Sequence, residues 1–323
     1  MDEKVKVARL SIISNLFLTL GKLAVGFSMH SVSVISEAIH SGLDLVAALV
    51  TFYSVRKSSQ PADESHPYGH GKYENLASIV EALLIIAAAV MIIKQALPRL
   101  SGQGEIYSLD LGLMVMAVSS LVNYFISSKL MSVARAADSP ALFADAWHLR
   151  TDVYTSLGVF AGILSIKLTG IKIIDPLVAI AVAGLILKAA WDLIKESMAS
   201  MLDASLPEEE EKAIQLVLGQ YSNKYLEYHH LRTRKSGAQR YIDLHLVVPK
   251  CSVIIKSHEL CDQIEKELKS KLPHIEEVLI HIEPCEEKCE DCRIDPGKSI
   301  IINRSLSETG QCANCWAQKQ EDA

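Results

Sequence analysis

Six apolar stretches, each about long enough to cross a bilayer, occupy most of residues 1–203 of this 323-residue chain. A helix needs about 20 consecutive apolar residues to span the hydrocarbon core. Small residues recur in each stretch and suit close helix packing in lipid. The sequence therefore predicts an all-α, six-helix transmembrane bundle. The expected spans are Ala8–Met29, Val32–Val55, Leu76–Leu97, Leu109–Met131, Ala141–Lys167 and Ile174–Ile194.

The basic residues in the connecting segments indicate how this bundle is oriented. An even number of spans places both termini on one side, and the first span lacks an obvious small-residue cleavage site. The terminus side carries Lys4, Lys6, Arg9, Arg56, Lys57, Lys72, Lys129 and Arg135, whereas the other side carries mainly Lys94, Arg99, Lys167 and Lys172. Because basic loops favour the cytoplasm, we expect a multi-pass protein of the cell (inner) membrane with both termini cytoplasmic.

The chain after the last span resembles a soluble protein. Pro207 and the acidic run Glu208–Glu211 begin a helix, and "KYLEYHHLRTR" and "QRYIDLHLVVP" predict two strands joined by the turn "KSGA". "SHELCDQIEKELKSKL" has helical periodicity, and "VLIHIEP" predicts a third strand. The order helix–strand–strand–helix–strand indicates a small α+β domain. We expect a membrane domain at 1–203, a cytosolic domain at 204–285 and a cysteine-rich tail at 286–323.

Two identical pairs of polar residues interrupt the apolar spans. His40 and Asp44 lie four positions apart in the second span, as do His148 and Asp152 in the fifth. Residues four apart share one face of a helix, and ionisable groups at bilayer depth usually line an ion pathway. Two imidazoles and two carboxylates suit Zn²⁺, Cd²⁺, Fe²⁺ or Co²⁺. Hydrogen-bonded helix pairs without a metal are the alternative.

Other acidic residues in the spans are open to more than one interpretation. Glu37 and Glu81 either line the cavity or lie near helix ends, and Asp145 precedes His148 by one turn and is a candidate to orient it. The loop "ADESHPYGHGK" brings Asp63, His66 and His70 within reach of one metal ion. Solvated histidines in a polar loop are the alternative there.

The cytosolic segment is rich in histidine. It holds His229, His230, His245, His258, His274 and His281, which are six of the eleven histidines in the chain. Alternate residues of a strand share a face, so His281 and Glu283 point the same way. A sheet face carrying His229, His245, His281 and Glu283 would bind a metal ion, and surface histidines on a small sheet are the alternative.

The tail has a cysteine pattern of its own. Cys289, Cys292, Cys312 and Cys315 follow the spacing C-x₂-C-x₁₉-C-x₂-C, which is typical of a zinc ribbon. In a reducing cytoplasm, metal binding is favoured over disulfides. An iron–sulfur cluster or a disordered, thiol-rich metal-collecting segment would use the same residues.

Taken together, these motifs resemble those of the cation diffusion facilitators, which are divalent-metal/proton antiporters. The resemblance covers about Val7 to Cys285 and rests on the paired ligands, "QPADESHPYGHGKYE", "LRTRKSG" and "HIEP". It implies a homodimer with six membrane helices and a cytosolic ferredoxin-like domain. The His/Asp version of the pairs is similar to that of zinc-selective members.

The resemblance also implies three metal sites and one ion pair. The transport site would be His40, Asp44, His148 and Asp152; the loop site would be Asp63, His66 and His70; and the cytosolic site would be His229, His245, His258, His281 and Glu283. Many relatives carry aspartate where this chain has Glu283. Lys72 and Asp203 match a family charge interlock between the two subunits.

These features lead us to expect efflux of a divalent cation, most simply Zn²⁺, in exchange for protons. A membrane-bound metal sensor and an uncoupled metal channel are the alternatives. The mild net charge of −6 argues against nucleic acid as a partner. An enzyme is not expected, because the sequence lacks a nucleophile elbow, a phosphate loop and an HExxH motif.

Overall fold

The computed structural model describes residues 3–28, 32–100, 111–169, 173–250 and 252–285. The chain divides into two compact units, Met1–Leu202 and Asp203–Ala323, which are described separately. The cysteine tail, with Cys289, Cys292, Cys312 and Cys315, lies outside the described residues.

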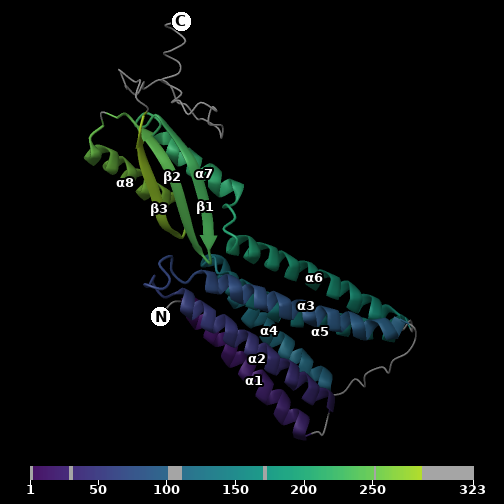
Figure 1. Ribbon diagram of the computed structural model, residues 1–323. Coiled ribbons are helices and arrows are strands. Elements are labelled where there is room, and N and C mark those ends of the chain that lie inside the picture. Colours follow the sequence, from purple (N-terminus) through teal and green to yellow (C-terminus); the bar gives the residue numbers. More distant parts are fainter. Residues whose placement is uncertain (1–2, 29–31, 101–110, 170–172, 251, 286–323) are drawn as a thin grey trace. The chain divides into compact units, whose positions relative to one another are not determined.

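The first unit consists of long helices (Figure 1). They are α1 (Glu3–Ser28), α2 (Val32–Ser58), α3 (Lys72–Leu100), α4 (Leu111–Ala136), α5 (Pro140–Thr169) and α6 (Ile174–Met201). Within the described ranges, four segments are long and apolar enough to cross a membrane, namely α1, Ala38–Ser58 of α2, α3 and α6. Each expected span overlaps one of the six helices.

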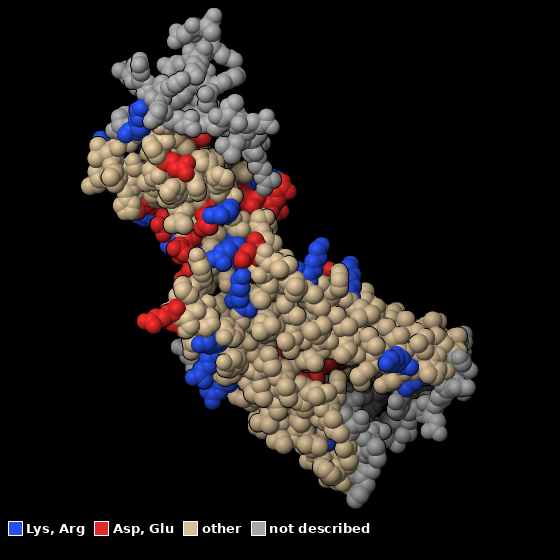
Figure 2. All heavy atoms as spheres, in the orientation of Figure 1, with Lys and Arg blue, Asp and Glu red and all other residues tan. Residues whose placement is uncertain are grey.

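The helical unit has an apolar outside and a polar, small-residue inside. Phe17 and Leu185 are each 71% exposed, whereas Ala48, Ala82 and Ala190 are fully buried. Figure 2 shows a largely uncharged surface over this unit. Small residues at helix contacts and large apolar residues facing outward are the arrangement that lipid favours. The most extensive contacts between helices are those of α3 with α6, α1 with α2 and α4 with α5.

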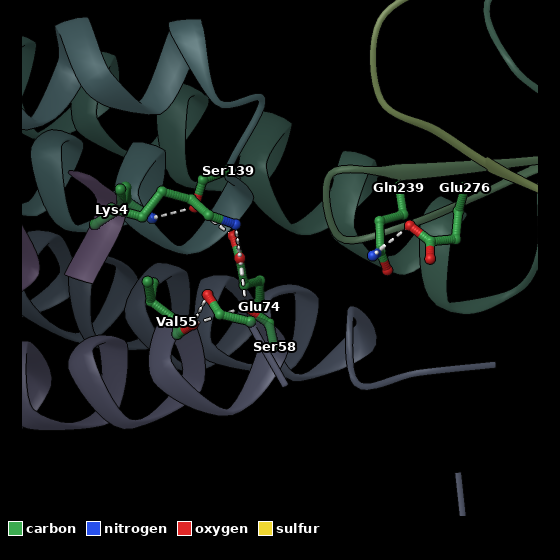
Figure 3. A network of polar contacts seen from close by, with 9 residues as sticks. Lys4, Val55, Ser58, Glu74, Ser139, Gln239 and Glu276 are labelled. Atoms are coloured by element: carbon green, nitrogen blue, oxygen red, sulfur yellow. Dashed lines mark hydrogen bonds and ion pairs between the residues drawn. The ribbon is translucent and has the colours of Figure 1, made fainter. Parts of the chain in front are cut away.

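A buried carboxylate joins four segments of this unit (Figure 3). Glu74, in the first turn of α3, pairs with Lys4 of α1 at 3.0 Å and accepts hydrogen bonds from Ser58 of α2 (2.6 Å) and from Ser139. The Ser139 hydroxyl also accepts the backbone N–H of Leu142 at the start of α5. Since a buried charge is tolerated only when it is paired, this network stabilises the packing at the end of the bundle where α1, α3 and α5 begin.

The second unit is a three-stranded sheet with two helices. It comprises α7 (Glu208–Gln220), β1 (Glu227–Ser236), β2 (Gln239–Val248), α8 (Ile254–Lys271) and β3 (Ile275–Pro284). β1 and β2 are antiparallel, and the turn between them contains Gly237 at a φ of 60°, which glycine adopts without strain. β3 lies parallel to β2, so the connection runs through α8. This is the element order that the sequence predicts.

The core of the second unit is formed by apolar side chains of both helices and the central strand. Ile214 and Leu218 of α7, Ile242 and Leu244 of β2, and Ile264 of α8 are fully buried. The alternation along β2 leaves Asp243 and His245 on the opposite face from this core. The core thus fixes which side of the sheet presents the histidines.

Candidate metal centres

The helical unit contains a buried group of potential metal ligands. Asp44 of α2 and His148 and Asp152 of α5 each offer a ligand atom within 4.8 Å of the other two. Nε2 of His148 lies 3.2 Å from Oδ1 of Asp44. One imidazole and two carboxylates can bind a divalent cation such as Zn²⁺ and leave at least one coordination position for a further ligand.

His40 is not part of this close group in the described structure. Its side chain is half-buried on α2, one turn before Asp44. Residues four apart share one face of a helix, but a shared face does not bring both side chains into one group. The structure therefore assembles three of the four residues expected at the transport site.

Several polar side chains surround the group from neighbouring helices. Asn123 of α4 donates a hydrogen bond to Oδ2 of Asp152 at 3.4 Å. Glu81 of α3 is fully buried, and its Oε2 lies 3.6 Å from Nδ1 of His148. Lys22 of α1 donates to Ser41 of α2 at 2.8 Å and is buried too. Asn123 and Lys22 were missed by the sequence analysis, although buried polar residues in apolar spans are a functional signal.

The loop between α2 and α3 assembles the second group, Asp63, His66 and His70. Oδ1 of Asp63 lies 3.2 Å from Nδ1 of His66, and Oδ2 lies 3.3 Å from Nε2 of His70. The backbone N–H of His66 also donates to Asp63 at 2.7 Å, and this bond lowers the pKa of Asp63 to about 2. An ionised carboxylate between two imidazoles is a suitable donor set for a divalent metal.

The sheet assembles the third group, His229, His245 and Glu283. His229 is paired across the strands with His245, and His245 with His281. Nδ1 of His245 lies 2.8 Å from Oε1 of Glu283, and Nε2 of His229 lies 3.2 Å from Oε2. Burial opposes ionisation of Glu283, but the hydrogen bond from His245 and the neighbouring imidazoles lower its pKa overall. The register therefore brings both histidines to one carboxylate.

Other residues expected at this site lie at its margin or elsewhere. His281 is 3.7 Å from Glu283, and its ring centroid is 4.9 Å from that of His245. His258 lies on α8, exposed, 3.9 Å from Asp262. His230, which the sequence analysis left unassigned, has a φ of 51° at a β-bulge, and its ring lies 5.0 Å from that of His229. A strand without a bulge would direct His230 to the other face.

The two residues of the expected charge interlock belong to different units of the chain. Lys72 donates to the carbonyl of Met201 at 3.3 Å, and Asp203 lies 3.6 Å from Arg234. An interlock between subunits stays a prediction.

Comparison with known proteins yields two matching family models and many related chains. The models "Cation efflux transmembrane domain" and "Cation efflux protein, cytoplasmic domain" match residues 8–202 and 206–285. An uncharacterised transporter of Synechocystis sp. is 32% identical over 85% of this chain and 87% of its own length. The cation-efflux pump FieF of Serratia proteamaculans is also 32% identical, over 83% of this chain and 88% of its own length.

A solved structure resembles the C-terminal part of the chain. The metal-bound C-terminal domain of the CzcD transporter from Thermotoga maritima is 30% identical, covering 24% of this chain and 87% of that domain, with a TM-score of 0.23.

Proposed function

Because the chain belongs to the cation efflux family, the cation diffusion facilitators, we propose that it exports Zn²⁺ from the cytoplasm in exchange for protons. Family membership makes it a membrane transporter of divalent metal cations. The observation that carries the finer proposal is the buried group of Asp44, His148 and Asp152. Ionisable residues at this depth are costly and are retained where an ion passes.

The donor set supports zinc as the cargo. One imidazole nitrogen and two carboxylate oxygens suit zinc, and His40, one turn from Asp44 on α2, can supply the fourth ligand if its side chain turns toward the group. Cd²⁺, Fe²⁺ and Co²⁺ accept the same donors, so competition among these metals belongs in any transport assay. The absence of sulfur from the group argues against copper(I) as the cargo.

The same donor set supports coupling to protons. A metal binds neutral imidazole and ionised carboxylate, so its binding displaces protons from the site. Histidine has an ordinary pKa of about 6.5, which makes proton competition effective near neutral pH. In the proposed cycle, cytoplasmic metal loads the deprotonated site, the bundle opens outward, and protons entering from outside release the metal. The protonated site then returns to the cytoplasmic side.

The remaining parts of the proposal concern topology and assembly. We infer six membrane spans from the six apolar stretches. The distribution of basic residues supports both termini in the cytoplasm and insertion in the cell membrane. The match to the family's cytoplasmic domain at residues 206–285 supports a homodimer. The cytosolic group of His229, His245 and Glu283 would bind regulatory metal, and the loop group of Asp63, His66 and His70 would bind metal next to the bundle.

The cytosolic group yields a first prediction. If metal binding favours one packing of the two cytosolic domains in the dimer, replacing His245 and His281 together with alanine should remove metal-dependent compaction. Small-angle scattering of the full-length protein in detergent, with and without added zinc, measures this. The control is His274→Ala, because His274 follows α8 and contributes to none of the three metal groups. A wild-type scattering profile that zinc does not change would contradict the regulatory role.

Flux into proteoliposomes separates the proposed antiporter from its alternatives. A sensor would bind zinc in its cytosolic domain and carry no flux. A channel would carry flux that requires the membrane site and is indifferent to protons.

A further inference from the structure

The imidazole of His148 lies between two carboxylates from two other helices. Its Nε2 is 3.2 Å from Oδ1 of Asp44 on α2, and its Nδ1 is 3.6 Å from Oε2 of Glu81 on α3. Asp44 belongs to the proposed transport site, whereas Glu81 lies on the far side of the ring from it. The two nitrogens of one side chain therefore face different acids.

Glu81 Oε2 and His148 Nδ1 share a further property. Both atoms are buried, and neither has a hydrogen-bond partner in the described structure. The Glu81 side chain is completely buried, and its other oxygen, Oε1, accepts a hydrogen bond from Thr51 of α2 at 3.0 Å. A buried carboxylate oxygen without a partner costs free energy, so the facing N–H donor is its natural counterpart once the site tightens around a cation.

We propose that Glu81 is a positioning residue of the transport site, which acts on the metal through His148. A neutral imidazole carries one proton, and only its other nitrogen can bind a metal. By accepting a hydrogen bond from the Nδ1–H group of His148, Glu81 keeps the proton on Nδ1 and leaves the lone pair of Nε2 available beside Asp44 and Asp152. Thr51 in turn holds Glu81. This inference rests on the proposed function, because it assigns a role within the same site.

General metal-site chemistry supports this role. Histidine ligands usually donate their second N–H to a carboxylate or carbonyl, which fixes the ring and makes the ligating nitrogen more basic. Asp145, the acid that the sequence suggested for this task, lies on α5 itself, whereas the acids at ion-pair distance from His148 within the described residues are Asp44 and Glu81. Glu81 comes from another helix, so its contact with His148 also ties the position of the ligand to the packing of α3.

The test compares zinc flux, as a function of zinc concentration, in proteoliposomes containing full-length variants. Flux isolates the transport site, because the loop and cytosolic groups do not carry cargo across the bilayer. Glu81→Met removes the acceptor and should raise the half-maximal zinc concentration by about 10- to 100-fold. Glu81→Gln keeps the shape and one acceptor oxygen and should recover most of the affinity.

The matched control is Glu74→Gln. Glu74 is another buried glutamate of α3, but its partners are Lys4, Ser58 and Ser139 (Figure 3). Because Glu74 does not contact a metal ligand in the described part of the chain, Glu74→Gln should leave the half-maximal zinc concentration within about twofold of wild type. The loss expected for Glu81→Met is larger, because Glu81 faces the ligand His148. If Glu81 only supports packing, Glu81→Met would lower the amount of folded protein or the maximal rate and leave the half-maximal concentration unchanged, which would overturn the inference.

A spectroscopic measurement reports on the ring directly. In ¹⁵N-histidine-labelled wild type with zinc, His148 should show a protonated Nδ1 and a metal-bound Nε2, and the signal is assigned by its loss in His148→Gln. In Glu81→Met the ring should show a second coordination mode through Nδ1. Unchanged signals in Glu81→Met would contradict the inference alone. Wild-type flux that does not depend on Asp152 would instead reject the proposed site, and the inference with it.

Discussion

Replacing Asp152 with alanine is expected to reduce gradient-driven zinc flux by at least about a hundredfold. Loss of a residue that hydrogen-bonds to a metal ligand typically costs about 10- to 100-fold in affinity or activity, and loss of a ligand itself should cost no less. Asp152 supplies one of the two carboxylates in the buried group, and Asn123 holds its Oδ2. Without it, a dication would face one carboxylate and one imidazole at bilayer depth. Proteoliposomes loaded with a zinc-sensitive dye and given an imposed pH gradient measure the flux.

The matched control is Asp192→Ala. Asp192 is an exposed aspartate of α6 and does not contribute to any of the three metal groups. Its replacement should leave the flux near the wild-type rate. Zinc flux that is retained in Asp152→Ala would show that the cargo takes another route. If the wild-type protein carries no flux but its cytosolic domain binds zinc tightly, the membrane-bound sensor would be favoured.

Collapsing the pH gradient is expected to stop zinc accumulation in wild-type vesicles. Metal binding at imidazole and carboxylate groups releases protons, so each transport cycle must return protons in the opposite direction. With an ionophore that equalises pH, zinc should no longer accumulate inside the vesicles above its external concentration, and its entry down its own gradient should slow. Zinc entry that continues down its own gradient at an unchanged rate would identify an uncoupled channel, because a channel needs no counter-ion.

The membrane domain and the sheet domain were predictable because their signals are local. Apolar runs of helical length define the spans, and the alternation "YIDLHLVV" places His245 on the face away from the core. The i, i+4 spacing predicted that His148 and Asp152 share a face of α5. It did not predict that His40 would lie outside the close group of Asp44, His148 and Asp152, because the position of each side chain depends on the neighbouring helix.

The residues that sequence reasoning missed are those contributed by tertiary contacts. Asn123 reaches the site from α4. Glu81 was left open between a cavity and a helix end, and only the packing of α3 reveals that it faces Nδ1 of His148. His230 was missed for a different reason, because a β-bulge with a positive φ turns it toward His229. A bulge inserts an unpaired residue into a strand, and regular alternation does not predict it.

The most direct test of the central claim is to measure whether a zinc gradient alone drives proton movement in the opposite direction. Vesicles containing the wild-type protein would be given a zinc gradient, with equal pH on both sides and a clamped membrane potential. One sample would contain a pH-sensitive dye inside the vesicles, and a parallel sample would contain a zinc-sensitive dye. The account predicts that zinc entry is accompanied by a rise in internal pH, as protons leave, and that both signals disappear in Asp152→Ala. Zinc entry without any pH change would contradict coupled exchange through Asp44, His148 and Asp152.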